Sequence, residues 1–171
     1  MEFFIDKNVI MDFIRLIYFN ESSDYYIYPS IIVLMIRDGV IKANISDVTP
    51  FSVGNYLNYK LQRAGVQETD KKTKNALKFL FKGDWNIVSL KIEDFLNCLE
   101  EKRIEYEDSY QVKCYLNTNS KFLITRNIKD FEKIKEIKKQ IINPKQFLLK
   151  YYKTDVEKYK KKVENLINFS I

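Results

Sequence analysis

The sequence predicts a three-layer α/β fold, in which a mainly parallel, twisted sheet is flanked by helices and a further helix lies at the C-terminal end. Short apolar runs, typical of buried strands, alternate with longer segments whose apolar residues recur at helical spacing. Hydrophobic residues make up 46% of the 171 residues, which is enough for a core without disulfides, and glycine (4) and proline (3) leave little room for linkers. We expect one domain over 1–150 and a helical extension over 151–171.

The expected elements follow one another in a regular order. Apolar or alternating runs predict strands over 2–6, 41–46, 85–90, 121–125 and 141–142. Helical spacing predicts helices over 8–17, 31–37, 49–63, 70–81, 91–102, 108–116, 130–137 and 145–152. Because strands and helices alternate, the connections predict a mainly parallel sheet with helices on both faces.

Several helix ends carry recognisable signals. Thr49 is a natural N-cap and Pro50 fits the first helical position, while Gly65 is a natural stop for the same helix. Thr154 and Glu157 form a capping-box pattern that opens a last helix over 154–169. That helix has an apolar stripe, which needs a partner surface: its own domain, a second copy of the chain or a separate partner protein.

The residue types that are missing exclude much chemistry. The chain has no histidine, so Ser-His-Asp and Cys-His catalysis and histidine-based zinc sites are excluded. Cys98 and Cys114 lie in apolar, helix-like segments and are expected to be buried thiols in a reducing compartment. Charged residues interrupt the first apolar stretch, and no run approaches the roughly 20 apolar residues of a membrane span. We therefore expect a cytoplasmic protein with no membrane contact.

The positive charge is unevenly distributed. Residues 1–120 carry 15 Lys and Arg against 17 Asp and Glu, whereas residues 121–171 carry 14 against 6. A basic C-terminal third attracts a polyanion or an acidic partner chain, and the alternative is a solvated lysine-rich helix face.

Acidic and amide residues gather where this architecture ends its strands. Asp6 ends the first strand, Glu107 and Asp108 open a helix, and Thr125-Arg126-Asn127 ends a later strand with Asp130 just after it. In parallel sheets the ligand binds outside the carboxyl ends of the strands. Each acidic residue alone is typical of a turn or helix cap, but unpaired carboxylates that share one crevice repel each other, and a cation relieves the repulsion. Oxygen ligands of this kind favour Mg²⁺ or Mn²⁺.

Five segments resemble, in order and spacing over residues 1–150, the motifs of PIN-domain ribonucleases. They are Ile5-Asp6-Lys7-Asn8-Val9-Ile10-Met11-Asp12, the stretch Ile45 to Tyr56, Glu107 to Gln111, Phe122 to Phe131, and Asn143-Pro144-Lys145-Gln146-Phe147-Leu148. The resemblance implies a PIN-like fold and a Mg²⁺- or Mn²⁺-dependent endoribonuclease. It further implies the toxin half of a toxin–antitoxin pair, with RNA, an antitoxin and a second copy as partners.

The same resemblance implies roles for single residues. Asp6, Asp108 and Asn127 would hold the metal, and Asp130 would complete the catalytic set through a bridging water. Supporting residues would be Asn8, Asn55, Glu107 and Thr125, with Glu107 also the alternative ligand to Asp108. RNA contacts would come from Lys7, Arg126 and Lys129, where Lys7 has the alternative of pairing with a site carboxylate. Apart from the resemblance, Tyr25, Tyr26 and Tyr28, near Asp24 and Pro29, are the best exposed candidates for stacking on a base.

Two positions that are acidic in many family members are amides here, Asn55 and Asn127. The alternative function is therefore a PIN-like module that binds RNA or a protein partner with little or no catalysis. A flavodoxin-like or Rossmann nucleotide binder is disfavoured, because no glycine-rich phosphate loop follows the first strand.

Overall fold

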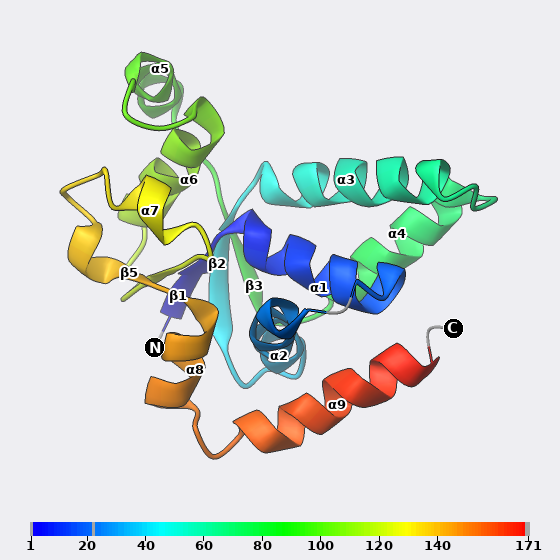
Figure 1. Ribbon diagram of the computed structural model, residues 1–171. Helices are drawn as coiled ribbons and strands as arrows, with labels where there is room; N and C mark the ends of the chain where they lie inside the picture. Colours follow the sequence, from blue (N-terminus) through cyan, green and yellow to red (C-terminus); the bar gives the residue numbers. More distant parts are fainter. Residues whose placement is uncertain (1, 22, 170–171) are drawn as a thin grey trace.

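A parallel sheet forms the centre of the molecule. The computed structural model describes residues 2–21 and 23–169, and it confirms the predicted α/β class (Figure 1). In this part of the chain the strands are β1 (Glu2–Ile5), β2 (Lys42–Ser46), β3 (Trp85–Val88), β4 (Leu123–Ile124) and β5 (Ile141–Ile142). They lie in the order β3-β2-β1-β4-β5, and every neighbouring pair is parallel. The chain therefore leaves β1 toward β2 on one side and later returns to its other side with β4.

The helices follow the predicted order, with corrections to their ends. They are α1 (Lys7–Phe19), α2 (Asp24–Arg37), α3 (Thr49–Arg63), α4 (Thr69–Leu80), α5 (Ile92–Glu100), α6 (Tyr106–Leu116), α7 (Ile128–Phe131), α8 (Pro144–Tyr151) and α9 (Val156–Phe169). Val48, not Thr49, is the N-cap of the helix Thr49–Arg63, and the helix expected to open at Thr154 begins at Val156. The helix expected over 31–37 begins at Asp24, because the Ser23 side chain caps it there. Pro29 lies inside this helix and does not mark its start. The helix expected over 130–137 ends at Phe131. Ile134 and Ile137 still reach the core, but through successive turns.

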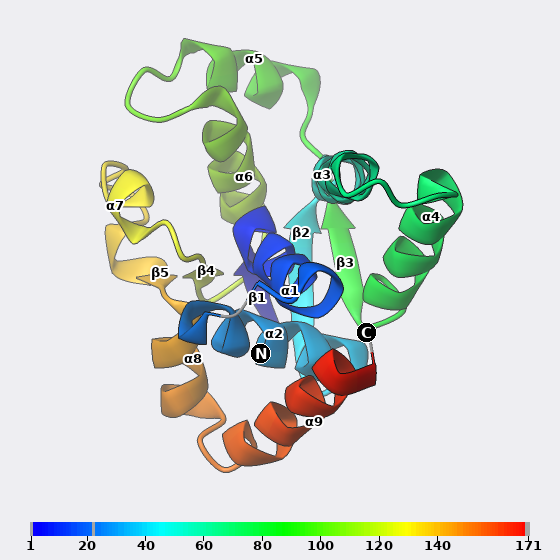
Figure 2. The same ribbon diagram turned by 45° about the vertical axis from the view of Figure 1, so that its right-hand side comes forward.

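Successive strand residues point to opposite faces of the sheet and divide the core in two. Phe3 and Ile5 join the larger core cluster, which α1, α2, α8 and α9 cover, together with residues of α3 and α4. Phe4 and Leu123 point to the other face and pack with residues of α5, α6 and the α7 region. Figure 2 shows α6 and α7 on one side of the strands and α2, α8 and α9 on the other. The three-layer architecture predicted from the sequence is thus present. Cys98 and Cys114 are buried free thiols in the smaller cluster.

The last helix packs against its own chain. Val156, Tyr159 and Val163 are buried in the larger core cluster. The Tyr159 hydroxyl donates to Asp38 Oδ2 at 3.0 Å, and Lys162 Nζ pairs with the same oxygen at 2.6 Å. Three partner surfaces were considered for the apolar stripe of the last helix, and the structure shows that the stripe packs against the chain's own domain. The boundary at residue 150 stays a prediction.

No helix within the described ranges is long and apolar enough to cross a membrane.

Candidate functional site

Two buried polar side chains meet where β1 and β4 end. Asp6 follows β1 directly and Thr125 follows β4 directly, and neither residue is exposed to solvent. Thr125 Oγ1 donates to Asp6 Oδ2 at 2.6 Å. Because β1 and β4 are parallel neighbours, their carboxyl ends lie at the same edge of the sheet, and this contact follows from the topology. It lies beside the point where the strand order reverses, the usual ligand position in such sheets.

Asp6 is also the N-cap of α1. Its Oδ1 accepts a hydrogen bond of 3.4 Å from the Asn8 backbone N–H, and its Oδ2 accepts one of 3.1 Å from Asn8 Nδ2. Burial raises the pKa of Asp6, and the hydrogen bonds from Thr125 and Asn8 act in the opposite direction. Asn8 and Thr125 thus both donate hydrogen bonds to the Asp6 carboxylate, as the prediction that they orient it requires.

Asp108 lies in the first turn of α6 and is 9% exposed. Burial raises its pKa to about 6, and the negative charge of Asp6 is the next largest cause. The Asp6 charge thus adds to the effect of burial on Asp108, whereas the Lys7 charge lowers the pKa of both carboxyl groups. Glu107 is engaged elsewhere, because its carboxylate pairs with Lys7 Nζ and accepts a hydrogen bond of 3.0 Å from Ser52 Oγ. Glu107 and Asp108 were both considered as the metal ligand at this position. Glu107 is the one that pairs with Lys7, and Asp108 is the one whose pKa the Asp6 charge raises.

A cavity of about 420 Å³ opens beside Asp108. Asn127 and Asp130 line it together with Lys102, Arg103 and Lys133. The Asn127 backbone N–H donates to Thr125 Oγ1 at 2.9 Å, so Thr125 links Asn127 to Asp6. Asp130 pairs with Lys133 at 2.7 Å, and hydrogen bonds from Lys133 and Asn127 lower the pKa of Asp130. Asp108 and Asn127 therefore face one cavity, with Asp130 at its solvent-exposed side.

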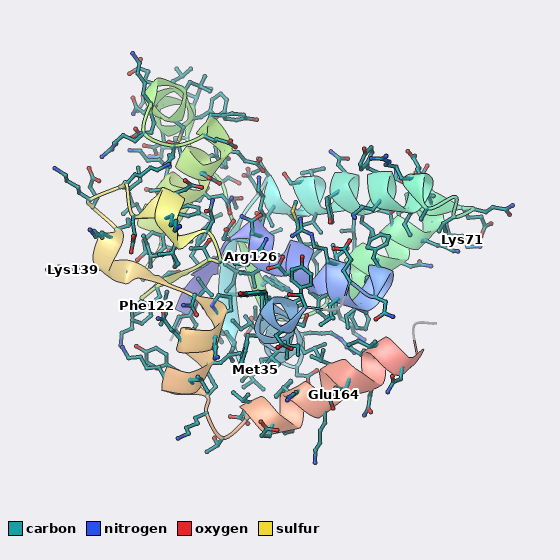
Figure 3. The ribbon with its side chains drawn as sticks, in the orientation of Figure 1. Met35, Lys71, Phe122, Arg126, Lys139 and Glu164 are labelled. Atoms are coloured by element: carbon teal, nitrogen blue, oxygen red, sulfur yellow. The ribbon has the colours of Figure 1, made fainter. Side chains whose placement is uncertain are left out.

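The predicted RNA-binding residues have different surroundings. Lys7 pairs with the Glu107 carboxylate, and pairing with a site carboxylate was one of the two alternatives predicted for it. Lys129 is exposed. Arg126 Nε lies 3.0 Å from Oδ2 of the fully buried Asp12, which also pairs with Arg15 at 3.1 Å. Burial raises the pKa of Asp12 to about 6 although both guanidinium groups act against it. Figure 3 shows Arg126 near the middle of the molecule, whereas Lys139 lies at its left margin.

The structure does not bring every predicted residue to this cluster. Asn55 is exposed on α3, one turn after Ser52, and Ser52 is the α3 residue that contacts Glu107. Sequence reasoning also missed the buried Gln111, whose Oε1 accepts from the Lys7 backbone N–H at 3.2 Å while its Nε2 has no hydrogen-bond partner among the described residues. Its position three residues after Asp108, on the same helix face, could have indicated it. Sequence reasoning also missed Asp12, which could have been found as a carboxylate within the apolar stripe of a helix.

The chemistry of the cluster fits a divalent cation bound by few protein ligands. Within residues 2–21 and 23–169, no three His, Cys, Asp or Glu side chains come together as a complete metal site. Asp6 and Asp108 are instead two buried carboxyl groups whose pKa values burial raises and the Lys7 charge lowers, and Asp108 and Asn127 line the cavity whereas Asp6 does not. Mg²⁺ commonly keeps several waters and uses one or two carboxylates together with substrate phosphates. The donor set therefore fits Mg²⁺ or Mn²⁺ in a site completed by water or substrate.

We compared the sequence with protein-family models and with curated proteins, and neither comparison gave a match.

Proposed function

We propose that this chain is a PIN-like, divalent-metal-dependent endoribonuclease that acts in the cytoplasm. The observation that carries the proposal is that two buried carboxyl groups, Asp6 and Asp108, lie near the carboxyl edge of a parallel sheet, where burial and then the charge of Asp6 raise the pKa of Asp108. Keeping two such carboxylates ionised near each other is unfavourable unless a cation offsets their repulsion. The motif resemblance of residues 1–150 supplies the reaction class.

Each residue of the cluster has a task in this proposal. Asp6 and Asp108 would hold Mg²⁺ or Mn²⁺, and Asn127 would add a neutral oxygen. A metal bound there supplies a more acidic water and a positive charge near the phosphodiester. Thr125 and Asn8 fix the rotamer of Asp6 through Oδ2, which leaves the less strongly bonded Oδ1 as the better donor. Lys7 pairs with Glu107, and its charge also lowers the pKa of Asp6 and of Asp108, against the effect of burial.

The charges around the cavity support a polyanionic substrate. Lys102, Arg103 and Lys133 line it beside Asp108. Arg103 also pairs with Glu101 and Lys133 with Asp130, so their charges are partly offset. A phosphate chain that entered would compete for these exposed cations, and salt would weaken its binding.

A second candidate function is a PIN-like module that binds RNA or a protein without cutting. Its supporting observation is the donor set itself, because Asn127 replaces a carboxylate at the cavity and Asp130 is paired with Lys133. Fewer negative ligands weaken metal binding. The two candidates differ in whether metal removal and the loss of Asp6 or Asp108 change what the protein does to RNA.

The deciding experiment incubates labelled single-stranded RNA with the purified chain in Mg²⁺ or Mn²⁺ and again in EDTA. We expect cleavage that EDTA stops, and that Asp6→Asn and Asp108→Asn abolish with folding intact by circular dichroism. Glu107→Gln is the matched control and should retain cleavage. Salt-dependent RNA binding without any cleavage would favour the second candidate.

The toxin assignment has its own test. Induced expression of the wild-type chain is expected to arrest growth, expression of Asp6→Asn is not, and a small neighbouring gene product is expected to restore growth. The assignment falls if the wild-type chain slows growth in none of the hosts tested.

A further inference from the structure

A second cavity, of about 530 Å³, lies near the ends of β4 and β5. It is formed where the start of α2, the segment after β4 and the start of α8 come together. Tyr25, Tyr28 and Asp24 line it from α2, Arg126 and Ile128 from the segment after β4, and Lys145 from α8. We call it the tyrosine pocket.

The tyrosine pocket offers flat rings beside apolar surface. Tyr25 is 76% exposed, although it lies in an ordered helix, and it is among the most exposed large hydrophobic residues of the described chain. Tyr28 is half-buried, and Lys145 Nζ lies 5.4 Å from the centre of its ring. An aromatic ring that a helix presents to solvent at a cavity is suited to stack on a planar ligand. Every nucleobase has such a face.

The charges favour a base over a phosphate inside the pocket. Arg126 is already paired with the buried Asp12, and Asp24 adds an exposed carboxylate to the lining. A carboxylate repels a phosphate but accepts a hydrogen bond from an exocyclic amino group of a base. Lys145 remains as a cation at the start of α8, where a backbone phosphate next to the bound base can reach it.

The pocket and the proposed cleavage site are neighbours along the chain. Arg126 lines the tyrosine pocket and the next residue, Asn127, lines the cavity that Asp108 faces. A single RNA strand that passes residues 126 and 127 would therefore present a base on one side and a phosphate on the other.

We propose that the tyrosine pocket binds one unpaired nucleobase of the RNA strand, stacked on Tyr25 and Tyr28, next to the nucleotide whose phosphate enters the Asp108 cavity. This inference rests on the proposed function for the identity of the polymer, but base binding itself needs no metal and no cleavage. It identifies the substrate as single-stranded at this position, because a paired base cannot enter.

The test measures the fluorescence anisotropy of a short labelled single-stranded RNA in EDTA, where no metal-dependent cleavage takes place. A backbone of the same length without bases is the second probe. We expect Tyr25→Ala to weaken RNA binding by about 5- to 150-fold, the range for loss of one base stack, and Tyr25→Phe to bind like wild type. Tyr59→Ala is the matched control, because Tyr59 is an exposed tyrosine on α3 (55%) outside the pocket. The baseless probe should bind more weakly, and Tyr25→Ala should not change its affinity.

The inference is overturned if wild type binds no RNA, if Tyr25→Ala binds RNA as tightly as Tyr59→Ala does, or if it weakens both probes equally. Its failure is separable from failure of the proposed function. Base-dependent binding that Tyr25→Ala removes, in a protein that never cuts RNA, would sustain the pocket and remove the nuclease. Metal-dependent cleavage with no effect of Tyr25→Ala on RNA binding would sustain the nuclease and remove the pocket.

Discussion

Thr125 Oγ1 donates a 2.6 Å hydrogen bond to Asp6 Oδ2 and accepts one of 2.9 Å from the Asn127 backbone N–H. One buried hydroxyl thereby joins the end of β1 to the loop after β4, although Asp6 and Thr125 are 119 residues apart in the sequence. The hydroxyl orients the carboxylate that the proposed metal site depends on.

Replacing Thr125 by valine tests this link. The valine keeps the branched shape but cannot donate to Asp6, so Oδ2 loses one of its two donors. We expect the metal concentration needed for half-maximal RNA cleavage to rise by about 10- to 100-fold, the usual effect of losing such a supporting contact. Thr125→Ser keeps the hydroxyl and should behave nearly like wild type. Equal metal dependence of Thr125→Val and Thr125→Ser would contradict the proposed role of this hydrogen bond.

The burial of Asp108, together with the charge of Asp6, predicts a pH-dependent cost to stability. The pKa of Asp108 is about 6 in the folded chain, above its ordinary 3.8, so the folded state binds this proton more tightly than the unfolded state. The stability that this proton contributes is present below about pH 4 and is lost as the pH rises through about 6. In EDTA at pH 7.5, we expect Asp108→Asn to stabilise the protein by about 1 to 3 kcal/mol.

Urea unfolding of wild type and Asp108→Asn, across a pH series, measures this effect. The difference between the two proteins should shrink toward pH 4, and Mg²⁺ should raise the stability of the wild type alone. A variant that is less stable than wild type at pH 7.5 would show that Asp108 stabilises the metal-free fold, contrary to the account.

The contact between α9 and α2 predicts a large contribution of the tail to folding. Tyr159 is 2% exposed and its hydroxyl donates to Asp38. We expect Tyr159→Ala to lower the free energy of unfolding by about 3 to 5 kcal/mol, as for other large buried aromatic residues. Tyr159→Phe removes only the hydrogen bond and should cost about 1 kcal/mol. Urea unfolding measures both, and a loss below about 1 kcal/mol for Tyr159→Ala would mean that the helix does not depend on its own domain.

The sequence was sufficient for the order of elements and for placing Asp6 and Thr125 at the carboxyl edge of the sheet. The helix Thr49–Arg63 has the bounds that were predicted, because Pro50 lies in its first turn and Gly65, with φ +70°, follows its end, but its N-cap is Val48 and not the predicted Thr49. The start of α2 was missed because Pro29 resembles a boundary when only the sequence is known, whereas the Ser23 cap shows its true start. The carboxyl ends of parallel strands share an edge, so Asp6 and Thr125 could be expected at the same edge of the sheet, whereas their contact depends on β1 and β4 being neighbours, which only the structure shows.

The finer parts of the site depend on helix rotation, which a sequence pattern does not fix. Neighbouring residues on a helix point about 100° apart, so only one of Glu107 and Asp108 could face Asp6. Packing of α6 against the sheet decides for Asp108 and directs Glu107 to Lys7 and Ser52. The same uncertainty affected α3, where Asn55 is exposed and Ser52 makes the contact.

The central claim is that Asp6 and Asp108 together bind a divalent cation, and calorimetric titration of Mn²⁺ into the purified protein tests it most directly. The account predicts binding to wild type and to Glu107→Gln, and loss of that binding in Asp6→Asn and in Asp108→Asn. Absence of binding to wild type at millimolar Mn²⁺, both with and without single-stranded RNA, would contradict it, as would binding that survives in both aspartate variants.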